Sequence, residues 1–140
     1  MNKTWNTVDE ILKRMRVVAV VGLSGRPDRP SYQVASYLQA QGLRIIPVNP
    51  TIADVLGEKA YPSLRDVPVS IDVVDVFRRP DEIEPIVDDA ITVGAPVLWL
   101  QLGVVNDAAA RQAEAAGMTV VMDRCLKVEH QKSRERMRHW

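Results

Sequence analysis

The sequence predicts an α/β fold in which five parallel strands form one sheet with helices on both faces. Three observations point to this class. Five short apolar runs are typical of buried strands, helical patterns separate most of them, and glycine or proline stands at most of the boundaries. A length of 140 residues suits one core, so we expect a single domain over residues 1–140.

A short helix is expected within residues 1–16, ahead of the first strand. Thr7 and Glu10 have the spacing of a capping box, and apolar residues at positions 8, 11, 12 and 15 recur at helical spacing. The valine-rich run 16–21 follows, and it is typical of a buried parallel strand.

Ser31 is expected to cap the next helix, which should end near Gly42. Residues 43–48 then form the second strand. Glycine and proline punctuate the passage beyond it, in which we expect a short helix and loops.

The third strand covers residues 71–77, where Asp72 and Asp75 interrupt the apolar run. We expect one aspartate to lie at the strand entrance and the other to meet backbone or hydroxyl donors. Residues 96–102 and 119–122 are the fourth and fifth strands.

Helices connect the last three strands. One begins after Pro80, and an alanine-rich one begins at Asn106 or Asp107 and ends at Gly117. Residues 127–140 are expected to form a polar helix or tail.

Strands alternating with helices specify a Rossmann-like sheet with right-handed crossovers, for which we expect the strand order 3-2-1-4-5. In this doubly wound arrangement a ligand lies outside the carboxyl ends of the strands, at the switch point between strands 1 and 4. Residues that follow each strand are therefore the candidates for a binding site.

Composition excludes several classes of function. Lys and Arg total 18 and balance 18 Asp and Glu, so the cationic excess typical of nucleic-acid binding is absent. No apolar run reaches the roughly 18 to 20 residues of a membrane span, and we expect a cytoplasmic protein. With Cys125 as the single cysteine and only His130 and His139 beside it, neither a disulfide nor a metal site is expected. His130 is expected to be a solvated surface residue.

The loop after the first strand has the residue types that bind phosphates. Gly22, Ser24 and Ser31 offer a close backbone approach and hydroxyls, while Arg26 and Arg29 suit phosphate oxygens beside a helix N-terminus. The loop lacks the third glycine of a dinucleotide fingerprint. Solvated loop charges remain the alternative interpretation of the two arginines.

The second strand ends in Asn49 and Pro50. A nicotinamide-dinucleotide site usually has an acidic residue here for the ribose hydroxyl, and none is present. An amide at this position suits a nucleotide that is phosphorylated on its sugar. The alternative is a turn that simply ends the strand.

The remaining strand ends carry further candidates. Phe77 offers a face for a purine and Arg78 a cation for phosphate, whereas Arg79 is expected to point into water. Gln101 stands among apolar residues and suggests a hydrogen-bonding task. Cys125 places the thiol at the same edge of the sheet.

Several motifs together resemble the small bacterial and archaeal CoA-binding proteins, which are similar to the N-terminal CoA-binding domain of the succinyl-CoA synthetase α-subunit. The resemblance extends from about Val8 to His130. It is carried by Gly22-Leu23-Ser24 with Pro27, by Arg29-Pro30-Ser31-Tyr32, Pro47-Val48-Asn49-Pro50, Gly57-Glu58-Lys59-Ala60-Tyr61-Pro62-Ser63-Leu64, Trp99-Leu100-Gln101-Leu102-Gly103-Val104 and Met122-Asp123-Arg124-Cys125.

The resemblance implies coenzyme A as the ligand and assigns parts of it to residues of this chain. Phosphates would lie on the loop, the ribose and its phosphate near the second strand end, the adenine by the third, and the pantetheine arm by the fourth. The residues implied are, in that order, Gly22, Ser24, Arg26, Arg29, Pro30, Ser31 and Tyr32; Asn49 and Pro50; Phe77, Arg78 and Ile83; and Gln101, Leu102 and Gly103.

No enzymatic activity is expected. In the synthetase the phosphorylated histidine lies in a domain after the CoA-binding one, and this chain ends first. Ser24, Ser31 and Ser63 have no histidine in plausible reach, so no nucleophile and base can be paired. The sequence favours a protein that binds, carries or senses CoA or acyl-CoA, or that serves a partner enzyme.

Two other functions stay open at this point. One is an NAD(P)-binding, oxidoreductase-like domain, and the other is a redox module in which Cys125 forms a mixed disulfide with CoA. The alternative to the redox module is that Cys125 is buried and inert. A homodimer contact through the N-terminal helix and Trp140 is also open, with packing of Trp5 and Trp140 on their own subunit as its alternative.

Overall fold

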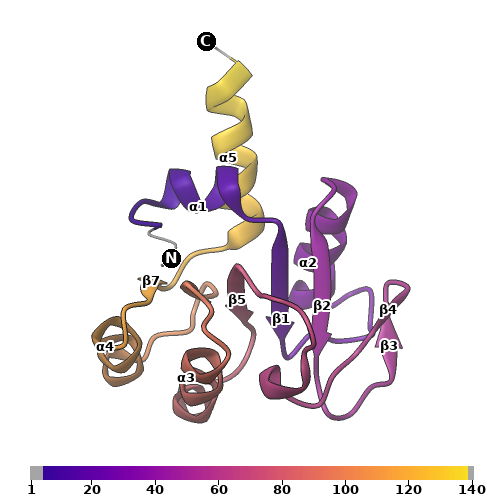
Figure 1. The fold of residues 1–140 in the computed structure, drawn as a ribbon. Coiled ribbons are helices and arrows are strands. Elements are labelled where there is room, and N and C mark those ends of the chain that lie inside the picture. The colour runs from indigo at the N-terminus through magenta and orange to yellow at the C-terminus, as the bar shows by residue number, and fades with distance from the viewer. Residues whose placement is uncertain (1–4, 139–140) are drawn as a thin grey trace.

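A computed structural model describes residues 5–138 of the chain (Figure 1). The expectations for residues 1–4, His139 and Trp140 lie outside these residues. Two short 3-10 turns cover Leu64–Asp66 and Pro80–Glu82. The helices and strands are α1 (Val8–Arg14), β1 (Val17–Val21), α2 (Pro30–Ala40), β2 (Arg44–Val48), β3 (Asp54–Val55), β4 (Glu58–Lys59), β5 (Val73–Val76), α3 (Ile83–Thr92), β6 (Val97–Leu100), α4 (Asp107–Ala115), β7 (Thr119–Val121) and α5 (Leu126–Arg138).

The main sheet has five parallel strands in the order β2-β1-β5-β6-β7, which confirms the α/β class. Tyr61 bridges to Val48 and so extends the sheet beyond β2. With Tyr61 counted as the third position, the six positions run 3-2-1-4-5-6 and contain the expected 3-2-1-4-5 pattern. Placing residues 71–77 at that position was wrong. Their strand, β5, pairs with β1 instead, so the switch point lies between β1 and β5.

Two helical layers cover the sheet. The apolar residues of α1, α2 and α5 pack with one set of strand residues, including Val18, Val73 and Trp99. Those of α3 and α4 pack with the alternate set, including Ala19 and Val74. Side chains alternate along a strand, so Asp75 and Gln101 belong to the face that α2 covers. Figure 1 shows α5 beside α1, extending beyond the sheet.

Helix capping follows the sequence at two of three expected places. Thr7 and Asn106 each accept a hydrogen bond from a backbone N–H in the first turn, as expected. Ser31 does not cap α2, because the N-cap is Arg29, two residues earlier, and the helix begins at Pro30, a residue preorganised for the first helical position. The Ser31 hydroxyl instead accepts a hydrogen bond from the backbone N–H of Ser24 at 3.0 Å.

The two aspartates of the predicted third strand have different roles. The Asp72 carboxylate accepts the backbone N–H groups of Arg16 and Val17 at 2.8 and 2.9 Å, and so joins two strand entrances as expected. Among residues 5–138, Asp75 meets neither a backbone nor a hydroxyl donor. Its partner is the side-chain amide of Gln101, which corrects the expectation.

The polar segment expected over residues 127–140 forms α5, within the described residues. His130 on this helix is buried, contrary to expectation, with its Nδ1 2.7 Å from the hydroxyl of Tyr37 on α2. Burial, with a smaller contribution from Arg134, lowers the pKa of His130. The packing of α5 against α2 therefore removes the histidine from solvent.

The N-terminal helix uses its apolar face inside its own subunit. Ile11, Leu12 and Met15 belong to the core, and Trp5 is also buried there. For Trp5, packing on its own subunit is therefore the correct alternative. None of the helices formed by residues 5–138 combines the length and the apolar character needed to cross a membrane.

Candidate functional site

A cavity of about 650 Å³ opens at the carboxyl ends of β1, β5 and β6, next to the first turn of α2. We call it the carboxyl-edge cavity. It brings together residues from the loops after these three strands, as the switch-point rule predicts. Its lining residues are Gly22, Ser24, Arg26, Arg29, Pro30, Ser31, Val34, Phe77, Gln101, Leu102, Val104 and Cys125.

The loop between β1 and α2 is held by hydrogen bonds of its own. The Ser24 N–H donates to the Ser31 hydroxyl, the Arg26 N–H donates to the Ser24 hydroxyl at 3.1 Å, and the Arg29 N–H donates to the Arg26 carbonyl at 3.1 Å. These bonds place two arginine side chains at the cavity beside the positive end of the helix dipole. Such an arrangement attracts an anion.

The charges of the two arginines are balanced differently. The Arg26 guanidinium has Asp28 nearby, with 3.5 Å between Nε and Oδ1, and both side chains are exposed. Arg29 is also exposed and forms no ion pair within residues 5–138. Arg29 is therefore the cation at this cavity that is free to pair with a ligand.

Gly22 lets the ends of β1 and β5 approach each other closely. Its φ is +85°, a conformation that favours glycine, and a Cβ at this position would collide with the backbone carbonyl oxygen of Phe77. The Gly22 N–H also donates to the Val48 carbonyl at 2.9 Å. The wall of the cavity at the switch point thus depends on the absence of a side chain.

Gln101, which lines the cavity, forms a buried polar pair with Asp75, which is not part of the lining. Gln101 donates from Nε2 to Oδ1 of Asp75 at 2.7 Å, and both residues are buried. Burial raises the pKa of Asp75 to about 7, while the hydrogen bond from Gln101 acts in the opposite direction. Gln101 was expected to form a hydrogen bond, and Asp75 is its partner.

Cys125 lines the same cavity and is half-buried. The neighbouring Arg124 directs its guanidinium toward Glu129, with 3.5 Å between Nη1 and Oε1. The buried Trp99 donates its indole N–H to the Arg124 carbonyl at 2.8 Å. The thiol is thus close to the cavity, and the nearest cation in sequence already has a carboxylate partner.

Two of the residues expected at the site lie in a second, smaller pocket. Pro50 and Arg78 line a space of about 240 Å³ together with residues of β1, β2 and α3. Arg78 approaches Glu82, with 3.9 Å between Nη1 and Oε2. This pocket lies on the face covered by α3, opposite the carboxyl-edge cavity.

The remaining expected residues line neither space. Asn49 forms a turn, since its amide donates to the Leu23 carbonyl and accepts from Thr51. Tyr32 is half-buried against the core, and the Gly103 N–H donates to Asp123 at 2.7 Å. Ile83, the first residue of α3, is fully buried in the core on the face that α3 covers.

Val34 and Val104 line the carboxyl-edge cavity, although sequence reasoning did not identify them. Both are apolar residues that are largely buried, so nothing in the sequence separates them from ordinary core positions. The position of Val34, one helical turn after Ser31, is the one signal that could have pointed to it.

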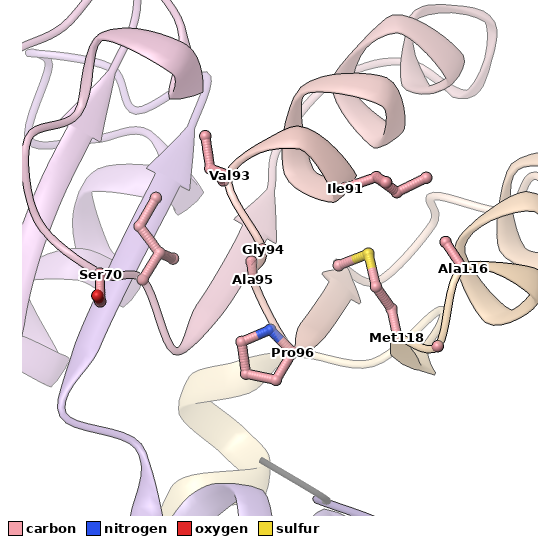
Figure 2. A pocket seen from close by; sticks show the side chains of 10 residues that line it. Ser70, Ile91, Val93, Gly94, Ala95, Pro96, Ala116 and Met118 are labelled. Carbon is pink, nitrogen blue, oxygen red and sulfur yellow. The ribbon is translucent and has the colours of Figure 1, made fainter. Parts of the chain in front are cut away.

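A third cavity of about 390 Å³ lies at the opposite edge of the sheet, where the strands begin (Figure 2). Apolar residues such as Ile91 and Met118 border it. Of the residues that line it, Ser70 alone has a polar side chain and none is ionisable. This cavity offers no counterpart to the charged groups of the carboxyl-edge cavity.

Comparisons with known proteins agree on one kind of domain. Residues 16–131 match a family model described as "CoA binding domain". An uncharacterised protein of Bacillus subtilis, YneT, is 46% identical over 123 residues, which are 88% of this chain and 91% of that protein.

Solved structures show the same relationship. A hypothetical protein from Pyrococcus horikoshii superposes with a TM-score of 0.86 at 38% identity, covering 94% of this chain and 98% of that one. An acetyl-coenzyme A synthetase from Ca. Korarchaeum cryptofilum gives a TM-score of 0.70 at 26% identity. There the match covers 76% of this chain and 26% of that one. The likeness thus concerns one part of the synthetase.

Proposed function

Because the chain belongs to the family of CoA-binding domains, we propose that it binds coenzyme A or an acyl-CoA in the carboxyl-edge cavity, beside the N-terminus of α2. One observation carries the proposal. Arg26 and Arg29, the Ser24 hydroxyl and the first turn of an eleven-residue helix meet at one cavity, which continues to the buried amide of Gln101.

The cavity fits such a ligand in size and in charge. Its volume of about 650 Å³ falls within the range of roughly 300 to 1,000 Å³ that is typical of small-molecule and cofactor sites. The 3′-phospho-ADP part of CoA carries a charge of about −3.5 to −4, counting about −1.5 to −2 for its phosphate monoester. Two arginines and a helix dipole offset part of that charge.

We assign the parts of the ligand as follows. The diphosphate binds at Gly22, Ser24, Arg26 and Arg29, and the pantetheine arm extends toward Gln101. Pro50 and Arg78, which border the smaller pocket, receive the adenosine end with its 3′-phosphate. Phe77 lines the larger cavity next to the close approach at Gly22, and it offers an aromatic face at the boundary.

We propose binding, carriage or sensing of CoA without catalysis by this domain. The side chains that line the cavity include two serines and a cysteine but no histidine. His130 pairs with Tyr37 between α2 and α5 and does not line the cavity. A base suitably placed for Ser24 or Ser31 is therefore missing from the lining of the cavity.

Arg29→Ala is expected to weaken CoA binding by about 1.5 to 3 kcal/mol, the range for a hydrogen bond to a charged group. The loss arises because Arg29 has no competing carboxylate among the described residues. Isothermal titration calorimetry measures the effect. Arg111→Ala on α4 removes the same charge from an exposed position away from both pockets and serves as the control. Equal affinities of wild type and Arg29→Ala would place Arg29 outside the site.

Titration with NAD(P) separates the proposal from the oxidoreductase alternative. We expect NAD(P) to bind much more weakly than CoA. The reason is that β2 is followed by Asn49 and Pro50, without an acidic group for the ribose. Tight NAD(P) binding with no response to CoA would reverse the assignment.

The position of Cys125 in the cavity favours a second candidate function, the redox module. In that reaction the Cys125 thiolate attacks one sulfur of oxidised CoA, a mixed disulfide forms, and one CoA thiolate leaves and takes up a proton. Intact-mass analysis after treatment with oxidised CoA tests it. A CoA adduct on wild type that is absent from Cys125→Ser supports the module, and an unmodified wild-type chain rejects it.

A further inference from the structure

Asp75 lies beneath the carboxyl-edge cavity, and packing alone does not account for it. It is 0% exposed in the middle of the sheet, between Val20 of β1 and Trp99 of β6. Its Oδ1 accepts the hydrogen bond from Gln101, whereas Oδ2 is buried without a hydrogen-bond partner in the described structure. A buried carboxyl group with an unsatisfied oxygen destabilises a fold relative to a well-packed apolar side chain.

The partner of Asp75 is the side chain that reaches the cavity. Gln101 follows β6, is 4% exposed and belongs to the cavity lining. Its carboxamide has a donor end and an acceptor end of nearly the same shape. Since the donor Nε2 is engaged by Asp75, the carbonyl Oε1 is the end available to a ligand in the cavity.

We propose that Asp75 is a positioning residue that holds the Gln101 carboxamide with its carbonyl oxygen available to the carboxyl-edge cavity, so that the site selects ligands carrying an N–H donor there. This inference rests on the proposed function, because the pantetheine arm of CoA supplies amide N–H groups of this kind. Asp75 contacts no ligand itself. It acts through Gln101, whose amide would otherwise be free to present either end.

The choice of an acidic residue follows from this role. The ionised carboxylate of Asp75, present above its pKa of about 7, only accepts hydrogen bonds, so it fixes the Gln101 amide in one orientation. Ligand binding is therefore measured at pH 8. A serine or threonine hydroxyl both donates and accepts, and it would permit both orientations. An apolar residue would leave the buried Nε2 donor unsatisfied.

The experiment compares two ligands and two substitutions. CoA carries the pantetheine amides, whereas 3′-phospho-ADP has the same phosphates and adenosine without them. We expect Asp75→Leu, which removes the acceptor, to weaken CoA binding about tenfold. The affinity for 3′-phospho-ADP should change less than about twofold. Asp75→Asn has an acceptor oxygen and also a donor, so it permits both orientations of the Gln101 amide. Part of the population keeps the wild-type orientation, and CoA affinity should stay within about threefold of wild type.

The Gln101→Leu background tests whether Asp75 acts through Gln101. There, Asp75→Leu should cause no further loss of CoA affinity, as expected for two residues of one interaction. Thermal unfolding of each variant verifies that it is folded, and the affinity for 3′-phospho-ADP verifies the phosphate end of the site.

Two results would overturn the inference in different ways. Wild-type CoA affinity in Asp75→Leu, or an equal loss for both ligands, would remove the positioning role and leave the proposed function intact. Failure of the wild-type protein to bind either ligand would remove the proposed function together with the inference.

Discussion

Gly22→Ala is expected to lower the free energy of unfolding by about 2 to 4 kcal/mol, because it combines left-handed backbone strain with a backbone collision. Gly22 has a φ of +85°, and the new methyl group would meet the Phe77 carbonyl oxygen at the junction of β1 and β5. That oxygen belongs to the backbone, so relief requires the strand ends to separate. Urea unfolding of wild type and variant measures the difference.

Two other glycines separate the two contributions to this loss. A Cβ on Gly25, in the same loop, would meet nothing within 4 Å, and this residue lacks the left-handed φ. Gly25→Ala should therefore stay within about 0.5 kcal/mol of wild type or be slightly more stable. Gly42 has a φ of +90° in open space, so Gly42→Ala reports the backbone strain alone, about 1 to 2 kcal/mol. A Gly22→Ala variant no less stable than Gly42→Ala would contradict the close approach.

Asp75→Asn is expected to change the pH dependence of stability. Burial raises the pKa of Asp75 to about 7 in the folded protein, against 3.8 for an unperturbed aspartate. Between these values the folded state holds a proton that the unfolded state has released, so stability falls as pH rises. The contribution is complete below pH 3.8 and is lost as pH passes through about 7.

The size of this effect follows from the same two pKa values. From 1.36 kcal/mol per pKa unit, the wild-type protein loses about 2 to 3 kcal/mol from this group between pH 5 and pH 8. The asparagine side chain does not titrate, so the variant lacks this loss, and it gains stability relative to wild type as pH rises. Urea unfolding at pH 5 and pH 8 measures the free energy of unfolding of both proteins. Other titrating groups are the same in both, so their effects largely cancel when the variant is compared with wild type. A difference that stays constant with pH would show that Asp75 does not titrate in this range.

Local sequence patterns predicted the elements of the fold well. Valine-rich runs, the Thr7 and Asn106 caps and the glycine after α2 report conformations that neighbouring residues determine. Which strands pair with each other was harder to predict from the sequence, because parallel pairing joins segments that are far apart in the chain. The apolar run of β5 carried no sign that it would pair with β1 and leave the outer position to Tyr61.

The errors at single residues also have tertiary causes. His130 is buried because α5 packs on Tyr37, a contact that the polar composition of the helix does not indicate. Ser31 is not the cap because Pro30 starts the helix ahead of it and Arg29 becomes the N-cap. In the candidate site, charged and hydroxyl-bearing residues were identifiable by their chemistry. Val34 and Val104, in contrast, have no property that distinguishes a cavity wall from a core.

Capture of the CoA phosphates in the carboxyl-edge cavity is the central proposal for this protein. Calorimetric titration of the full chain with CoA, repeated with Arg29→Ala, tests it directly. We predict saturable binding of one CoA per chain, with affinity lowered by the substitution at Arg29 and preserved in Arg111→Ala. Absence of both binding heat and thermal stabilisation at millimolar CoA would contradict the claim.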